Sequence, residues 1–243
     1  DAVSNRLNAS LLKAQERVAA FGAQAKAAGK MLVGLGVAAV GAGLVVATKQ
    51  YVEFDAALHG AGAAFSDVDS TAADFEDRLH EIGGAARTVA AATEFDAKQT
   101  ADAMATLARA GVTSSNAIAL LPGVADLATA ACVNMDEAVG MAVGGLNVMG
   151  MMSDKPEILA QNMKRLSDVM AYTADSANMG LTDVSEAVKA GGAFFRTSNN
   201  DLNMFSASLT ALANNAIVGA EAGTHLRNIM TNLSAPTDKP KPP

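Results

Sequence analysis

The chain has 243 residues and a net charge of −7; half of its residues are hydrophobic, and it has one cysteine and no tryptophan. This length suits one or two domains with a real core. The apolar residues are mostly Ala, Val, Leu and Met, with few β-branched or aromatic runs, which favours helices. The single Cys132 excludes an internal disulfide and a cysteine metal cluster, and we interpret it as a small buried hydrophobe.

Charge is distributed unevenly along the chain. Residues 1–52 carry six Lys or Arg against two acidic residues, whereas residues 53–234 carry ten basic against 22 acidic residues. The sequence therefore has a basic leader and an acidic body. An acidic body binds phosphate poorly, and no basic groove with aromatic residues is present to hold single-stranded nucleic acid, so any contact with DNA is expected to be indirect.

The leader carries apolar residues that alternate in steps of four and three. This heptad seam predicts a left-handed coiled coil and hence a partner helix. A single amphipathic helix lying on its own domain is the alternative. The seam, which predicts an oligomer, consists of Leu7, Leu11, Ala14, Val18, Phe21, Ala25, Ala28, Leu32 and Leu35.

The seam continues into an uncharged, glycine-rich run, Met31–Ala47. A dinucleotide loop, Gly34-x-Gly36-x-x-Ala39, would need a strand before it, but only Met31–Val33 is left for one between the helical seam and Gly34. A membrane span and a helix packed inside an oligomer both suit the run. Glycines at heptad distance, which let helix backbones approach closely, favour a helix that packs in one state and meets lipid in another; these are Gly34, Gly36, Gly41 and Gly43.

From Tyr51 onward the pattern changes to short amphipathic helices. Phe75, Leu79, Ile82, Ala86 and Val89 predict one helical face, with a weak point at the glycine pair 83–84. Similar amphipathic segments follow at residues 94–111, 114–131, 134–150, 155–177, 181–195, 200–217 and 219–236. None of the stretches alternates as a strand would.

Short-range signals mark where these helices begin and end. Asp96, Asn134 and Asp183 each stand three residues before Gln or Glu, which predicts capping boxes. Pro156 predicts a helix start, and Pro122 predicts either a kink or the start of a second helix.

The sequence predicts no catalytic or cofactor site. His59, His80 and His225 are isolated, without metal-ligand spacing, and we expect them at the surface or at helix ends. No serine stands in a G-x-S-x-G motif, and the carboxylates are scattered over caps and solvent faces. The sequence thus predicts no enzyme, no cofactor and no metal.

These observations predict an all-α chain in three parts. Residues 1–50 form a long coiled-coil leader with the glycine-rich apolar helix, and residues 51–234 form a compact multi-helix domain. Residues 235–243 form a proline-rich linker, which we expect to lead onward into a longer protein.

Several motifs in the body resemble the core region of the tape measure proteins of tailed bacteriophages. They are "VEFDAAL" (52–58), "TEFDAKQTADAMATLARAGVTSSNAIALLPGVADLATAACVNMDEAV" (93–139), "TDVSEAVKAGGAFF" (182–195) and "LTALANNAIVGAEAGTHLRNIMTNLSAPT" (209–237). The most specific is the last, whose "GAEAGTHLR" we interpret as a turn and a helix start, with Gly219 and Gly223 providing backbone freedom.

The resemblance implies a structural scaffold that sets tail tube length and assists ejection of DNA through the host envelope. It places the protein in the virion tail, in the tube lumen or at the tip, and in the host envelope on ejection. It implies a homo-oligomer, trimer or hexamer, that contacts the tail tube, the tail-tip or baseplate hub proteins and a host membrane. The alternative from a different class is a pore-forming or effector module that inserts Met31–Ala47 into a membrane.

Overall fold

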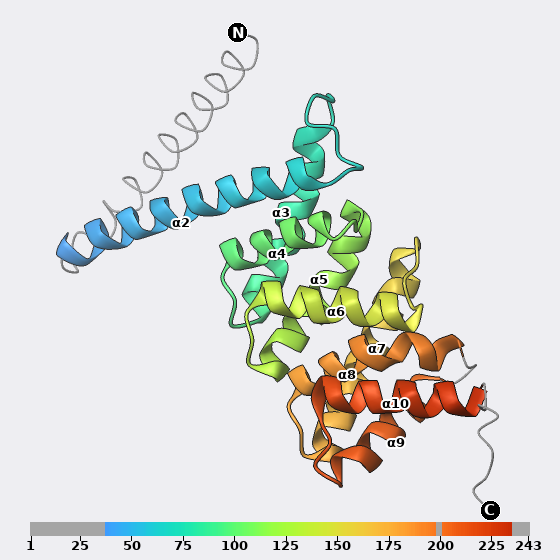
Figure 1. Cartoon of the computed structure of the whole chain (residues 1–243). Coiled ribbons are helices and arrows are strands. Elements are labelled where there is room, and N and C mark those ends of the chain that lie inside the picture. The colour runs from blue at the N-terminus through green and yellow to red at the C-terminus, as the bar shows by residue number, and fades with distance from the viewer. Residues whose placement is uncertain (1–36, 198–200, 235–243) are drawn as a thin grey trace, which may run out of the picture. The chain divides into compact units, whose positions relative to one another are not determined.

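The computed structural model describes residues 37–197 and 201–234, and every regular element within them is an α-helix (Figure 1). The prediction of an all-α chain is confirmed for this part. The predicted coiled coil of residues 1–36, and with it the whole heptad seam, lies outside the described residues. Two compact units divide the chain, Asp1–Asp55 and Ala56–Pro243.

The first described helix, α2, spans Val37–Ala64. The apolar run is therefore helical from Val37 onward, and Gly41 and Gly43 lie in this helix. The helix continues without a break through Tyr51, where the amphipathic pattern of the body begins. The strand required by a dinucleotide loop would fall on residues 31–33, outside the described residues.

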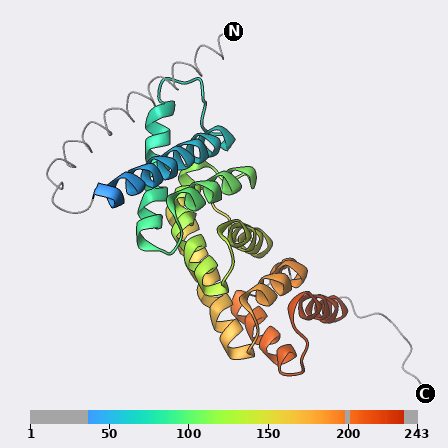
Figure 2. The ribbon, with the colours of Figure 1, turned by 90° about the vertical axis from the view of Figure 1, so that its left-hand side faces the viewer.

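The unit Ala56–Pro243 holds the end of α2 and all later helices. These are α3 (Phe75–Ala92), α4 (Ala97–Arg109), α5 (Ser114–Ala131), α6 (Met135–Met149), α7 (Pro156–Ala177), α8 (Leu181–Thr197), α9 (Leu202–Ala213) and α10 (Gly219–Ser234). Two views at right angles show α3 to α6 gathered at one end of this unit and α8 to α10 at the other (Figures 1 and 2). The two ends are joined by α7, which contacts both α5 and α9, and by α6, which packs directly against α8.

Local sequence signals account for most helix starts. Asp96 accepts a hydrogen bond from the Gln99 backbone N–H, and the Gln99 side chain accepts one from the Asp96 N–H, so the predicted capping box is present. Asn134 caps α6 by accepting from the Glu137 N–H at 2.9 Å, one of the two bonds of the predicted capping box. Pro156 occupies the first turn of α7, as predicted.

One helix-boundary prediction is corrected, and one of the two alternatives for Pro122 is excluded. Asp183 is not the cap of α8, because this helix begins at Leu181 and the Asp183 carboxylate accepts from the Gly180 N–H instead, at 3.2 Å. Pro122 does not start a second helix: α5 runs through it from Ser114 to Ala131. Leu120, Leu121 and Val124 around the proline are fully buried, so packing outweighs the lost backbone hydrogen bond.

The N-terminus of α5 is capped from a distant part of the chain. Both carboxylate oxygens of Asp67, in the loop after α2, accept from the Ser114 backbone N–H at 3.0 Å, and Oδ2 also accepts from the Ser114 hydroxyl at 2.7 Å. A negative charge at a helix N-terminus satisfies free N–H groups and interacts favourably with the helix dipole. Phe65 and Val68, which flank Asp67 in the loop, are buried. The loop is therefore held on the domain by these two side chains and by the Asp67 carboxylate.

Alanines and glycines lie among larger apolar side chains in the core and let the helices approach closely where they occur. The predicted face of α3 is confirmed at Leu79, Ile82, Ala86 and Val89, all buried. The helix α3 runs unbroken through the predicted weak point. Gly83 leaves room there for Leu58, because a Cβ on Gly83 would lie 2.8 Å from the Leu58 side chain. Larger residues fill the remaining space, as where the Phe195 and Phe205 rings meet edge to face at 5.1 Å.

Candidate functional site

The described residues hold no group of three or more His, Cys, Asp or Glu side chains that would bind a metal ion. The three histidines are exposed and lie apart, as predicted: the His59 ring is 6.4 Å from that of Phe75, and His225 is 3.6 Å from Glu221. The interpretation of Cys132 as a buried hydrophobe is wrong. Cys132 is exposed, and it ends α5 in the left-handed conformation, with φ of 54°.

The most specific geometry in the domain is the contact between α8 and α10, which brings the two backbones together. A Cβ placed on Gly223 of α10 would lie 2.3 Å from the Ala187 carbonyl oxygen of α8. A Cβ on Gly191 of α8 would lie 2.4 Å from the Gly223 carbonyl oxygen. Each glycine is therefore required at this crossing, because the atoms opposite belong to a backbone that cannot rotate away.

Small residues four apart create this contact on both helices. Ala187 and Gly191 lie one turn apart on α8, as do Gly219 and Gly223 on α10. Residues at this spacing share one face of a helix, and removing their side chains lets two helix axes come close. Close packing by glycine is thus observed between α8 and α10, whereas the close packing predicted for the glycines of the apolar leader stays a prediction.

Gly219 has a different role from Gly223. Its φ of +59° is unfavourable for other residues, so the predicted backbone freedom is confirmed here. An added Cβ would lie 3.4 Å from Glu186 Oε2 and 3.5 Å from Asp183 Oδ1. The start of α10 therefore faces two carboxylates of α8, a favourable arrangement for the positive end of the helix dipole.

The second half of α10 is largely exposed. Its apolar residues Leu226, Ile229, Met230 and Leu233 follow the spacing of one helical face. Leu226 is buried, but Ile229 is 45% exposed and Leu233 is 69% exposed. This spacing predicts that all four residues are buried, whereas the structure buries only Leu226.

Membrane-spanning potential can be judged only for the described residues. Among them, no single helix is long and apolar enough to cross a bilayer, and only α5 together with α6 passes by length and composition, with a bend of 112° between them. Of the glycines predicted for close packing in the leader, Gly34 and Gly36 lie outside the described residues.

Comparison with known proteins identifies the family. The profile of a family described as "Phage-related minor tail protein" matches residues 83–241, which include α4 to α10 and the α8–α10 contact. The chain belongs to this family. Membership in the phage minor tail family places the chain in the virion tail.

A curated relative supports the same assignment. The chain is 28% identical over 210 residues to the tape measure protein of Pneumococcus phage Dp-1. The match covers 84% of this chain and 18% of the relative, so the chain spans about a fifth of the length of that protein. The resemblance to tape measure proteins stated from the motifs is confirmed, and no solved structure matches the chain.

Proposed function

We propose that the chain is a core segment of a tail tape measure protein, a structural scaffold that sets tail tube length. The observation that carries the proposal is the match of 84% of the chain to a protein of that name. The all-helical structure supports it, because an α-helix rises 1.5 Å per residue and so converts residue number linearly into distance. The proposal assigns no catalysis and no cofactor to the chain.

Residues 37–234 would span about 300 Å as one continuous helix. The unit Ala56–Pro243 is instead folded into packed helices, so the proposal requires it either to unfold for the measurement of length or to occupy the tail tip. The α8–α10 contact is the point where we expect opening to begin, because Leu226 is the only large buried apolar side chain of α10.

An in-frame deletion of residues 37–234 from the tape measure gene of the phage tests this proposal. If the segment lies extended in the tube, electron microscopy will show tails shorter by about 300 Å, and if it remains compact the shortening will be a fraction of that. The matched control is Gly84→Ala, an open position on α3 that leaves chain length unchanged. Tails of unchanged length in the deletion would refute a role in setting length.

We further propose that the protein forms a homo-oligomer, trimer or hexamer, through the heptad seam of the leader, and contacts the tube and the tip or baseplate hub proteins. Apolar residues every three to four positions support association. Analytical ultracentrifugation of the 243-residue chain and of a Leu11→Glu, Val18→Glu double variant tests this. A monomeric wild-type chain, or an oligomer unaffected by both charges, would contradict it.

The proposal also includes a role in DNA ejection, with the run Met31–Ala47 meeting the host membrane. Its lack of charge and the lysines on both sides (Lys26, Lys30 and Lys49) support this role. Dye release from anionic liposomes by the 243-residue chain measures it, with Gly36→Glu, Val40→Glu as the matched variant. If the wild-type chain releases no dye, both the ejection role and the alternative of a pore-forming or effector module lose their basis.

A further inference from the structure

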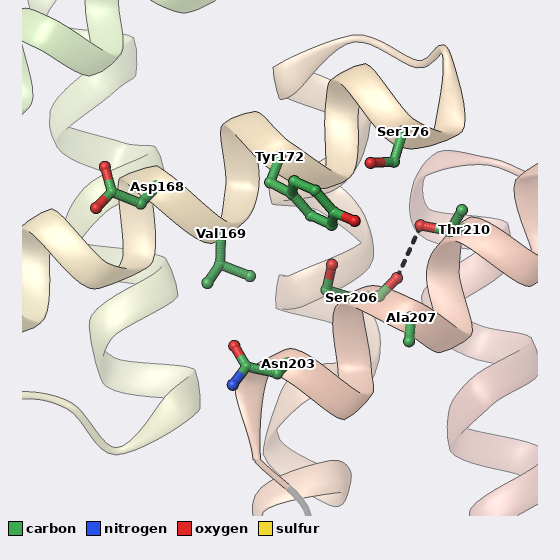
Figure 3. Close-up of a pocket in the computed structure, with 8 residues that line it drawn as sticks. All are labelled: Asp168, Val169, Tyr172, Ser176, Asn203, Ser206, Ala207 and Thr210. Carbon is green, nitrogen blue, oxygen red and sulfur yellow. Dashed lines mark hydrogen bonds between the residues drawn. The ribbon is translucent and has the colours of Figure 1, made fainter.

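A groove lies between α7 and α9 on the surface of the unit Ala56–Pro243. It has a volume of about 530 Å³ and is lined by Asp168, Val169, Tyr172, Ser176, Asn203, Ser206, Ala207 and Thr210. Figure 3 shows the Tyr172 ring extending from α7 toward α9 in the middle of the groove, with Asn203 at one end and Ser176 and Thr210 at the other. A volume of this size is in the range of small-ligand sites.

One hydrogen bond at the floor of the groove joins the two helices, and a second lies within α9. The hydroxyls of Thr173 and Ser206, both buried, lie 2.6 Å apart across the helix pair. The Thr210 hydroxyl donates to the Ser206 carbonyl oxygen at 3.1 Å (Figure 3). Phe205, the neighbour of Ser206 on α9, packs edge to face against Phe195 of α8, which also holds α9 in place.

The groove wall combines an aromatic ring with uncharged hydrogen-bonding groups. Tyr172 is 68% exposed, which is unusual for a large aromatic residue and leaves its ring accessible. The Asn203 amide nitrogen donates to the Asp201 carboxylate at 3.4 Å and keeps a second N–H beside the amide oxygen, and Ser176 adds an exposed hydroxyl at the other end. The Asp168 carboxylate is held by Lys164 at 2.8 Å and forms the edge rather than the centre.

From this combination we propose that the α7–α9 groove is a saccharide-binding site. A pyranose ring has an apolar face of C–H groups, which stacks on an aromatic ring, and a rim of hydroxyls, which pair with amide and hydroxyl side chains. Tyr172 supplies the stacking surface, and Asn203 and Ser176 contact the rim. This inference goes beyond the proposed function and does not depend on it, since a scaffold sets length whether or not it binds sugar.

The same chemistry argues against an apolar helix as the occupant. Grooves that bind amphipathic helices present large apolar side chains to the partner. Here Val169 and Ala207 are the only aliphatic residues in the lining, and the rest carry hydroxyl, amide or carboxylate groups. Ser206, Thr210 and Asp168 already have partners within the domain. A partner with hydroxyls therefore meets the Tyr172 and Ser176 hydroxyls and the Asn203 amide.

Tyrosine fluorescence of the 243-residue chain tests the proposal directly. The chain has two tyrosines and no tryptophan, so the Tyr51→Phe variant reports Tyr172 alone. We expect saturable changes on titration with cellobiose or N,N′-diacetylchitobiose, with a Kd on the order of 1 mM. Calorimetry should show affinity reduced about tenfold or more in Tyr172→Ala and in Asn203→Ala, while Tyr51→Ala, on α2, retains it.

Three results would overturn the proposal. The first is the absence of a saturable signal for both disaccharides at about 50 mM, far above the expected Kd. The second is binding that survives both Tyr172→Ala and Asn203→Ala in variants whose helical circular dichroism is that of the wild type. The third is binding of an apolar dye such as ANS in the groove that saccharide does not displace, which would assign the groove to an apolar partner.

Discussion

Replacing Gly223 by alanine tests the close contact between α8 and α10. The new Cβ would lie 2.3 Å from the Ala187 carbonyl oxygen and 2.8 Å from the Ala190 Cβ. Ordinary contact begins near 3.4 Å. Both atoms are rigidly attached to α8, so the helices must separate by about 1 Å to accommodate the added methyl group.

Two opposing effects set the magnitude. Overpacking a well-packed site costs about 1–3 kcal/mol, and the rigid backbone opposite places this case at the upper end. The higher helix propensity of alanine returns about 1 kcal/mol. We therefore expect the free energy of unfolding to fall by about 1–2 kcal/mol, which in a domain of this size lowers Tm by about 2–8 °C.

Thermal unfolding followed by circular dichroism at 222 nm measures the change, and hydrogen exchange shows whether α10 amides lose protection first. Gly84→Ala and Gly140→Ala are matched controls, since both positions lie within helices and an added Cβ meets nothing within 4 Å. At these two positions, replacing glycine by alanine should raise the free energy of unfolding by about 0.5–1 kcal/mol. A Gly223→Ala chain as stable as these controls would refute the close contact.

Three further predictions concern stability and ionisation. Asp67→Ala removes the distant cap of α5 and should lower the free energy of unfolding in urea by about 0.5–2 kcal/mol; an unchanged midpoint would contradict this role. Leu226→Ala should cost about 2–5 kcal/mol by the same measurement, whereas Leu233→Ala, 69% exposed, should change it by less than about 0.5 kcal/mol, and equal effects would disprove the difference in burial. Hydrogen bonds from the Thr71 hydroxyl and backbone N–H lower the pKa of Asp69 below 3.8, so its contribution to stability is present above that pH and is lost as pH falls through the lowered pKa. An NMR titration should show this pKa rising toward 3.8 in Thr71→Ala, and an unchanged value would exclude the hydroxyl as its main cause.

Features encoded within one helical turn were predictable from the sequence. The capping box at Asp96, the cap at Asn134 and the start at Pro156 depend on residues three or four apart, and the structure confirms each of them. The same holds for the buried face of α3, where apolar spacing alone identifies the residues that pack inward.

Features that join distant segments were not predictable in this way. Nothing near Ser114 indicates that its cap is Asp67, because the two meet only after the intervening helices have packed. The sequence indicates that α8 and α10 can each pack closely, because small residues stand four apart on both helices. It does not indicate that these two helices pair with each other, since that depends on tertiary structure. The α7–α9 groove likewise requires two faces that are far apart in the sequence.

Attraction between packed atoms weakens steeply with distance, so a gap of 0.5–1 Å already loses about a quarter to a half of it. The α8–α10 contact consists of backbones in direct contact, with Leu226 as the one large buried side chain from α10. A small separation of the two helices therefore removes much of the attraction between them. Under axial tension α10 would part from α8 abruptly rather than by gradual yielding, and the force at that step would be set by two glycines.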